Sequence, residues 1–360
     1  NDPKLVIKGN LLVEAAGNNP STAVLRLLLA SGRYDVNAEG GGFFPPRTPF
    51  AAASATNPNP EVLRTLIEAG ATYDVDAKGS LTPLMAAMSN PNLEVARFLL
   101  ELGFDPNVTT RNGNTAYLVN AAWGVLPGAF PLLVEYGADP NVAQLGLDSL
   151  ANIGGINKTE GMMAAAIDAG TRVRAIQGDG STTLGWAVKN DSLDPLATLL
   201  ERGVDPNVGT PPVLVECGIL SSRPEMVGLL LDAGADPDRL LESARLASTF
   251  RMLTPGSNAL MGAAFNLTEE AAAVLQAFVD AGFDVDATNR SGTTALMMVA
   301  SRSVDLGDQT VPMLRVLIDA GADPTLRDKR GRTARDIAES NPKLEDVDLE
   351  AAFAPPVSNA

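Results

Sequence analysis

The feature of this sequence that most constrains its fold is an internal repeat. A short apolar run that ends in glycine recurs nine times, and four successive intervals between these glycines, from Gly70 to Gly203, are 33, 34, 33 and 33 residues. A fixed period of this length is typical of a solenoid, in which each unit buries its apolar face against its neighbours. The chain is therefore expected to form a repeat array rather than several globular domains.

Each copy of the repeat contains signals for two helices. The run before the glycine carries apolar residues at helical spacing, as at Leu314, Leu317 and Ile318, and the glycine suits the left-handed residue that follows a helix end. The Asp-Pro-Asn turn that follows in several copies cannot continue the helix. A second motif, such as LTPLMAAMS at 81–89, opens the partner helix with a Thr cap and small Ala residues. Each copy is predicted to be two helices and a hairpin finger.

These motifs resemble the ankyrin repeat, which combines a Thr-Pro-Leu-His opening, paired Ala, a Leu-Leu second helix and a Gly-Ala-Asp-x-Asn close. The resemblance covers about residues 10–340. It implies an all-α ankyrin-repeat helical solenoid with hairpin fingers and capping end repeats. We expect a single solenoid over 1–360, with an N-terminal cap at about 5–38, repeats at about 39–327, a C-terminal cap at about 328–352 and a tail at 353–360.

The sequence departs from the family pattern in two ways. Histidine is absent, so the polar link at the family's His position is missing, and cohesion is expected to rest more on apolar packing. Two insertions also lengthen the period: 238–257 is a candidate for a short additional helix, and 301–312 is expected to lengthen the turn between the helices of the ninth copy.

Charge and hydropathy exclude several classes of partner. The chain has 27 basic and 43 acidic residues, a formal net charge of −16, which would repel nucleic acid and anionic membranes. No run reaches the roughly 18 to 20 apolar residues of a membrane helix. The residues from 201 to 300 include 6 basic and 13 acidic side chains, so a protein partner with a basic surface would be attracted to the middle of the chain.

Catalytic, metal and cofactor signals are weak. Without histidine, the commonest general base and most zinc sites are missing, and no catalytic residue, metal ligand or cofactor site is predicted. The pattern around the lone cysteine, Cys217, is typical of a small buried hydrophobe on a helix. The recurring Asp residues after the glycines, such as Asp139 and Asp205, are interpreted as turn residues rather than as a carboxylate array. The chain is predicted not to be an enzyme.

The resemblance implies a partner site on the fingers and on the exposed face of the first helices. The finger residues carried over are Phe43, Phe44, Arg111, Asn112, Gln144, Leu145, Asp179, Asn289 and Arg290. The groove residues carried over are Ser89, Asn90, Trp123, Lys189 and Asn190. Two adjacent Phe residues are the best hot-spot candidates, the alternative being that they fold back on the first repeats. Trp186 is expected in the core. The basic run from Arg327 to Arg335 is expected to be a solvated end.

The favoured function is a protein-binding scaffold that uses the groove, in a sharper version an inhibitor or immunity-type protein that occludes a toxin or hydrolase. Binding of a glycan or small ligand in the groove is the alternative, and it would require clustered aromatic residues. We expect a monomer without nucleic-acid or membrane partners. An Arg-rich, Ala-rich composition suggests a bacterial source. A soluble protein is expected, cytoplasmic or, if a leader was removed before Asn1, periplasmic or secreted.

Overall fold

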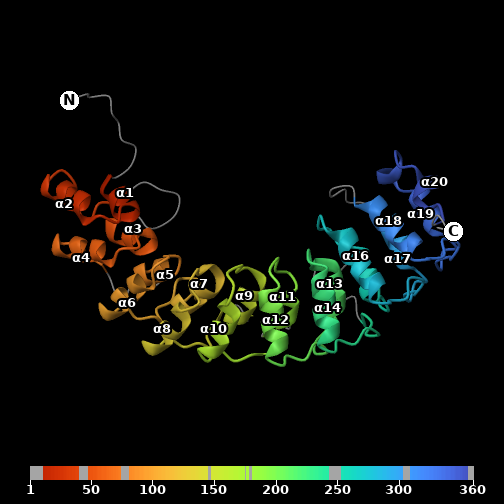
Figure 1. Ribbon diagram of the computed structural model, residues 1–360, viewed down its shortest axis with the longest axis horizontal. Helices are drawn as coiled ribbons and strands as arrows, with labels where there is room; N and C mark the ends of the chain where they lie inside the picture. The colour runs from red at the N-terminus through yellow and green to blue at the C-terminus, as the bar shows by residue number, and fades with distance from the viewer. Residues whose placement is uncertain are drawn as a thin grey trace. The chain divides into compact units, whose positions relative to one another are not determined.

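The computed structural model describes residues 11–39, 48–73, 81–144, 147–174, 176–177, 181–242, 253–302 and 309–355. These residues form two compact units, 1–173 (unit 1) and 174–360 (unit 2). Each unit is built almost wholly of paired short helices, so the predicted all-α helical solenoid is confirmed (Figure 1). The organisation as one solenoid over 1–360 stays a prediction.

Unit 1 contains five helix pairs. Its first helices are α1 (Leu11–Asn18), α3 (Pro49–Thr56), α5 (Pro83–Ala87), α7 (Ala116–Trp123) and α9 (Ser149–Gly155). Its second helices are α2 (Thr22–Ala30), α4 (Pro60–Glu68), α6 (Leu93–Glu101), α8 (Ala129–Glu135) and α10 (Met162–Asp168). Each first helix contacts the next first helix, and each second helix the next second helix, so the core is a continuous seam between two layers.

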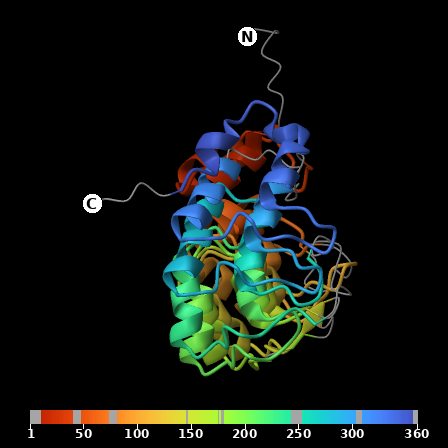
Figure 2. The same cartoon turned by 90° about the vertical axis from the view of Figure 1, so that its right-hand side faces the viewer.

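Unit 2 repeats this arrangement. Its first helices are α11 (Thr183–Ala187), α13 (Val213–Leu220), α15 (Ala259–Ala263), α17 (Ala295–Ala300) and α19 (Ala334–Glu339). Its second helices are α12 (Asp194–Glu201), α14 (Glu225–Asp232), α16 (Ala271–Asp280), α18 (Thr310–Asp319) and α20 (Leu349–Ala352), with a 3₁₀ turn at Pro342–Leu344 before α20. Figure 2, which faces this unit, shows the two layers as parallel columns.

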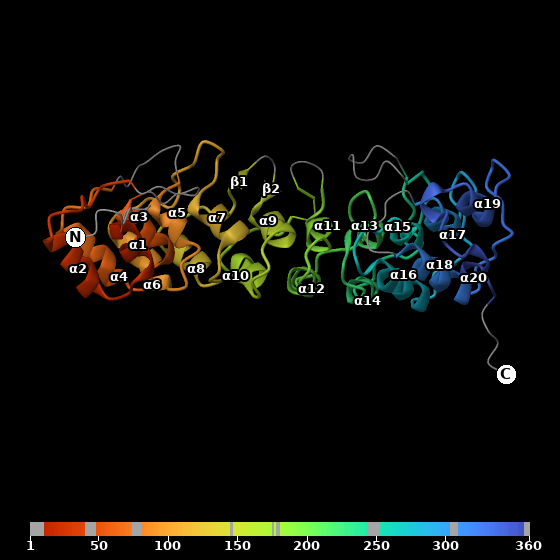
Figure 3. The ribbon, with the colours of Figure 1, turned by 90° about the horizontal axis from the view of Figure 1, so that it is seen from above.

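The predicted fingers precede the first helices. One of them contains the antiparallel strands β1 (Ala143–Gln144) and β2 (Leu147–Asp148), with Gln144 opposite Leu147. Figure 3 shows this hairpin on the side of α9 that faces away from α10. The candidate helix in 238–257 falls mostly on 243–252, and the lengthened turn in 301–312 falls mostly on 303–308; both segments lie outside the described residues.

Local chemistry sets the helix ends as expected. Thr82, Thr115 and Thr294 each accept the backbone N–H three residues ahead, which satisfies a donor that the first turn leaves free. The glycines after the second helices have positive φ, for example 88° at Gly137 and 91° at Gly321. The Asp side chains that follow accept the N–H two residues on, as Asp139 does from Asn141 at 2.8 Å. The interpretation of these Asp residues as turn residues is confirmed.

Cohesion between repeats has a polar component that sequence reasoning missed. Asparagines after the first helices donate through Nδ2 to backbone carbonyls of the preceding repeat: Asn57 to Ala16 at 2.7 Å, Asn157 to Gly124 at 3.0 Å and Asn266 to Ser221 at 2.7 Å. Because these carbonyls end a helix and have no partner within it, the asparagine satisfies them. The expectation that the histidine-free repeats cohere mainly by apolar packing is therefore incomplete.

Candidate functional site

Three predicted groove and finger residues are interior. Asn90, Asn190 and Asn289 are only 1%, 2% and 6% exposed. Asn90 Nδ2 donates to the carbonyls of Ser54 at 3.0 Å and Asn57 at 2.9 Å, and Asn289 Oδ1 accepts the N–H of Ser291 at 2.8 Å. Little of these three side chains is therefore open to a partner, and the amides of Asn90 and Asn289 hold backbone within the protein.

Trp123, at the end of α7, lies on the surface as expected. It is 57% exposed, and nearby Val125 and Ile156, which ends the α9 segment, are 42% and 50% exposed. Two hydrogen bonds anchor the backbone next to them: Val125 N donates to Met88 O at 3.3 Å, and Asn157 Nδ2 donates to Gly124 O at 3.0 Å, so the segments that carry Ile156 and Trp123 are neighbours. Trp123, Val125 and Ile156 form what we call the apolar ridge of unit 1.

Ser89 borders this ridge. It is exposed at the end of the α5 segment, directly after Met88, whose carbonyl holds Val125. Ser89 follows the C-cap of α5, and Trp123 is the last residue of α7 in the next repeat. The structure therefore leaves the predicted groove residues Ser89 and Trp123 exposed at the ends of the first helices of neighbouring repeats.

In unit 2, the exposed Lys189 lies against the half-buried Trp186. Lys189 Nζ lies 4.1 Å from the centre of the Trp186 ring, a cation–π geometry, and Trp186 Nε1 donates to Ser181 Oγ at 2.7 Å. Trp186 is only half-buried, so its prediction as a core residue is wrong.

The fingers give a mixed outcome. Arg111 and Asn112 are exposed at a turn that is closed by Thr110 N donating to Asn114 O at 2.9 Å. Arg290 is also exposed. Gln144 is placed by its backbone in β1. The predicted finger residues Phe43, Phe44, Leu145 and Asp179 lie outside the described residues.

A buried carboxyl lies beneath α11. Glu216 on α13 is 7% exposed, and its Oε2 accepts from Thr182 Oγ1 at 3.5 Å. Burial raises the pKa of Glu216 to about 7, against the opposing effects of Lys189 and of the Thr182 hydrogen bond. The neighbouring thiol of Cys217 is fully buried, as expected, and burial raises its pKa to about 12. Such a thiol is not an activated nucleophile.

Within the described residues, no group of three or more His, Cys, Asp or Glu side chains is arranged to hold a metal ion. In the same part of the chain, no helix has the length and apolar character that crossing a bilayer requires.

Comparison with known proteins identifies the repeat. Residues 12–110 and 50–144 match the family model for ankyrin repeats in three copies. Among solved structures, the ankyrin repeat domain of Bcl-3, described as a unique member of the IkappaB protein family, is similar over 73% of this chain and 98% of that domain, at 22% identity and a TM-score of 0.41. No curated protein sequence matches the chain significantly.

Proposed function

Since residues 12–144 match ankyrin repeats, we propose that this chain binds a protein partner against the apolar ridge of Trp123, Val125 and Ile156. Ankyrin repeats are general protein–protein interaction scaffolds, typically without catalytic activity. The observation that carries the proposal is the exposed indole of Trp123 with two exposed aliphatic neighbours. A clustered apolar surface of this kind marks interaction sites, and Trp is enriched among residues that dominate binding energy.

Charge extends the proposal to the kind of partner. The net charge of −16 favours encounter with a protein that has a basic surface and disfavours nucleic acid. In its sharper form the chain is an inhibitor or immunity-type protein: without chemistry of its own, it acts as a monomer by covering the active surface of a toxin or hydrolase. The acidic composition and the two insertions in the repeat support this form.

The ridge is tested by partner capture followed by affinity measurement. The full chain is used to capture a partner at low and high salt, and the dissociation constant is then compared with that of the double variant Trp123→Ala with Ile156→Ala. Because central apolar contacts dominate interfaces, we expect affinity to fall at least about tenfold. Leu27→Ala is the matched control, since Leu27 is 72% exposed on α2 of the same unit.

Two outcomes would contradict the proposal. Unchanged affinity of the double variant, with a melting temperature equal to that of the parent, would show that the ridge is not the interface. The inhibitor form is tested separately by adding the chain in stoichiometric excess to the captured partner and assaying the partner's activity. Full activity of the saturated complex would exclude occlusion and leave only scaffolding.

A further inference from the structure

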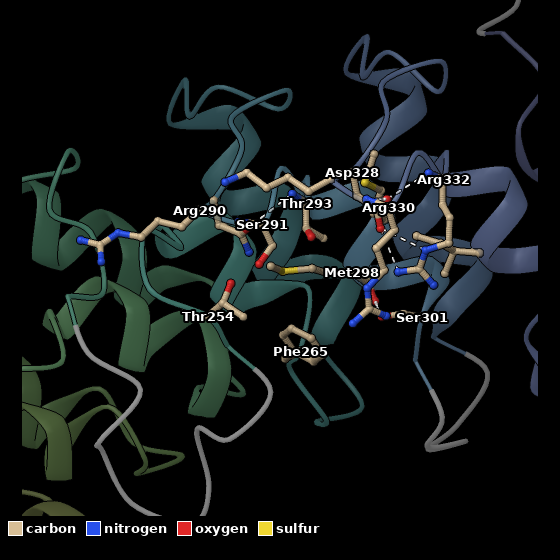
Figure 4. A pocket seen from close by; sticks show the side chains of 14 residues that line it. Thr254, Phe265, Arg290, Ser291, Thr293, Met298, Ser301, Asp328, Arg330 and Arg332 are labelled. Carbon is tan, nitrogen blue, oxygen red and sulfur yellow. Dashed lines mark hydrogen bonds and ion pairs between the residues drawn. The ribbon is translucent and has the colours of Figure 1, made fainter.

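The fingers that precede α17 and α19 in unit 2 border a cavity of about 360 Å³, which we call the finger pocket. Its floor comes from α17 and its neighbours: Met297, Met298 and Ile337 are buried, and Phe265 is half-buried. Figure 4 shows Phe265 and Met298 beneath the fingers that carry Arg290 and Arg330. A volume of this size suits one or two side chains of a bound segment rather than a large ligand.

Backbone hydrogen bonds hold the walls of the finger pocket in register. Lys329 N donates to Ser291 O at 3.0 Å, which joins the two fingers, and Arg290 N donates to Pro255 O at 3.2 Å. Within the second finger, Asp328 Oδ1 accepts the N–H groups of Arg330 at 2.8 Å and Arg332 at 2.9 Å. The backbone that carries the cationic side chains is therefore held in place by hydrogen bonds.

The rim of the pocket carries positively charged side chains that are not paired with carboxylates in the described part of the chain. Arg290, Lys329 and Arg330 are exposed, and none of them forms an ion pair with a carboxylate in the described part of the chain. Arg332 differs, since its guanidinium is paired with Asp328 Oδ2 at 2.8 Å. Arg327 and Arg335 are likewise paired, with Asp336 and with Glu339. All five side chains of the basic run are exposed, as expected of a solvated end, and Lys329 and Arg330 also line the pocket.

A buried hydroxyl provides a second, independent observation. Thr254 lines the finger pocket, and its Oγ1 is buried without a hydrogen-bond partner. Buried hydroxyls are seldom left unpaired, because an unmade hydrogen bond costs the desolvation of the group. An acceptor that enters the pocket, such as a carboxylate oxygen, would supply the missing partner.

We propose that the finger pocket binds an acidic segment of a protein partner, with a carboxylate at Arg290, Lys329 and Arg330 and an adjacent apolar side chain over Met298 and Phe265. This inference rests on the proposed function as a protein-binding scaffold and adds the chemistry of one contact. A polynucleotide fits less well, because it requires a long track of cations, whereas this cluster is short and has an apolar floor.

The test uses fluorescein-labelled peptides and needs no identified partner. The probe is Gly-Ser-Glu-Glu-Leu-Glu-Ser-Gly, compared by fluorescence anisotropy with the same peptide carrying Gln in place of Glu, and with a twelve-residue oligothymidylate. At about 50 mM salt we expect the Glu peptide to bind the full chain at least about tenfold more tightly than the Gln peptide, because charge-assisted pairs are the stronger ones. Equal binding of the two peptides would overturn the proposal. Tighter binding of the oligothymidylate would replace the acidic peptide with a nucleic acid.

Variants locate the binding. The double variant Arg290→Glu with Arg330→Glu should lower the affinity for the Glu peptide at least about tenfold. The control, Arg172→Glu with Arg174→Glu, makes the same charge change at two exposed arginines outside the pocket and should change this affinity less than about threefold. Thr254→Val should weaken binding about threefold to tenfold while leaving the melting temperature unchanged or raised, since it removes an unpaired hydroxyl. Unaltered peptide binding by the Arg290 and Arg330 variant would refute the site.

Failure here is distinguishable from failure of the proposed function. The apolar ridge belongs to unit 1 and is assayed with the captured partner, whereas the finger pocket belongs to unit 2 and is assayed with a defined peptide. Peptide binding that survives Trp123→Ala and is lost with Arg290→Glu would support the pocket even if the ridge proves wrong.

Discussion

Glu216 allows a quantitative prediction, because its carboxyl is buried on α13. Such a group either stays protonated in the folded protein or ionises at a cost in folding free energy. The perturbation is Glu216→Gln, which keeps the size of the side chain and an oxygen that can accept from Thr182, but cannot ionise. Burial raises the pKa of Glu216 from 4.5 to about 7. At about 1.4 kcal/mol for each tenfold change in proton affinity, this difference corresponds to about 3 kcal/mol.

The sign follows from proton linkage. Between pH 4.5 and 7 the unfolded chain releases the Glu216 proton while the folded chain retains it, so the free energy of unfolding falls as pH rises through this window and levels off above it. The Glu216→Gln variant lacks this loss. It should match the parent near pH 4.5 and exceed it by about 3 kcal/mol near pH 8.

Urea unfolding at several values between pH 4.5 and 8 measures this difference. In a Trp123→Phe background, Trp186 is the one remaining tryptophan and reports on unit 2, three residues from Lys189. Glu201→Gln, an exposed position on α12, is the matched control and should change the unfolding free energy by less than about 0.5 kcal/mol at any pH. The reasoning would be refuted if the unfolding free energy of the Glu216→Gln variant changed with pH in the same way as that of the parent. It would also be refuted if the variant were less stable than the parent at pH 8, since Lys189 would then stabilise the carboxylate more than burial opposes it.

Three further predictions follow from the packing. Asn90→Ala leaves the carbonyls of Ser54 and Asn57 without their donor and should cost about 3 kcal/mol in thermal or urea unfolding, whereas the exposed Asn18→Ala should cost under about 0.5 kcal/mol. Equal effects would be inconsistent with a stabilising role for the asparagine bonds between repeats. Gly218→Ala would place Cβ 2.7 Å from Ala259 O and from Ala263 N, so it should lower the free energy of unfolding in urea by roughly 2 kcal/mol despite the better helix propensity of Ala. Gly228→Ala, with open space around it, is the control and should raise that free energy by up to about 1 kcal/mol. A Gly218→Ala variant as stable as the parent would show that α13 and α15 can separate. Cys217, with burial raising its pKa to about 12, should react with a thiol reagent only in denaturant, and rapid modification of the folded protein would contradict its burial.

Much of the fold followed from the sequence because its determinants are local. The helix caps, the positive-φ glycines and the turn-forming Asp residues act over one to four positions, so their residue types at a period of about 33 residues are sufficient to predict paired helices. The burial of Cys217 and the exposure of Trp123 also followed from neighbouring residues on the same helix. These predictions needed no knowledge of how one repeat meets the next.

Contacts between repeats were decided only by the tertiary structure. Asn90 resembles a polar groove residue in the sequence, but its carbonyl partners are 33 and 36 residues away, and only the stacking of repeats places them within reach. Arg290 and Arg330 likewise look like separate finger and cap residues, until the hydrogen bond from Lys329 to Ser291 joins their fingers around one pocket. Short-range chemistry determined the repeat itself. The stacking of one repeat on the next decides which polar side chains are used for cohesion and which remain for a partner, and this long-range property is not specified by sequence spacing.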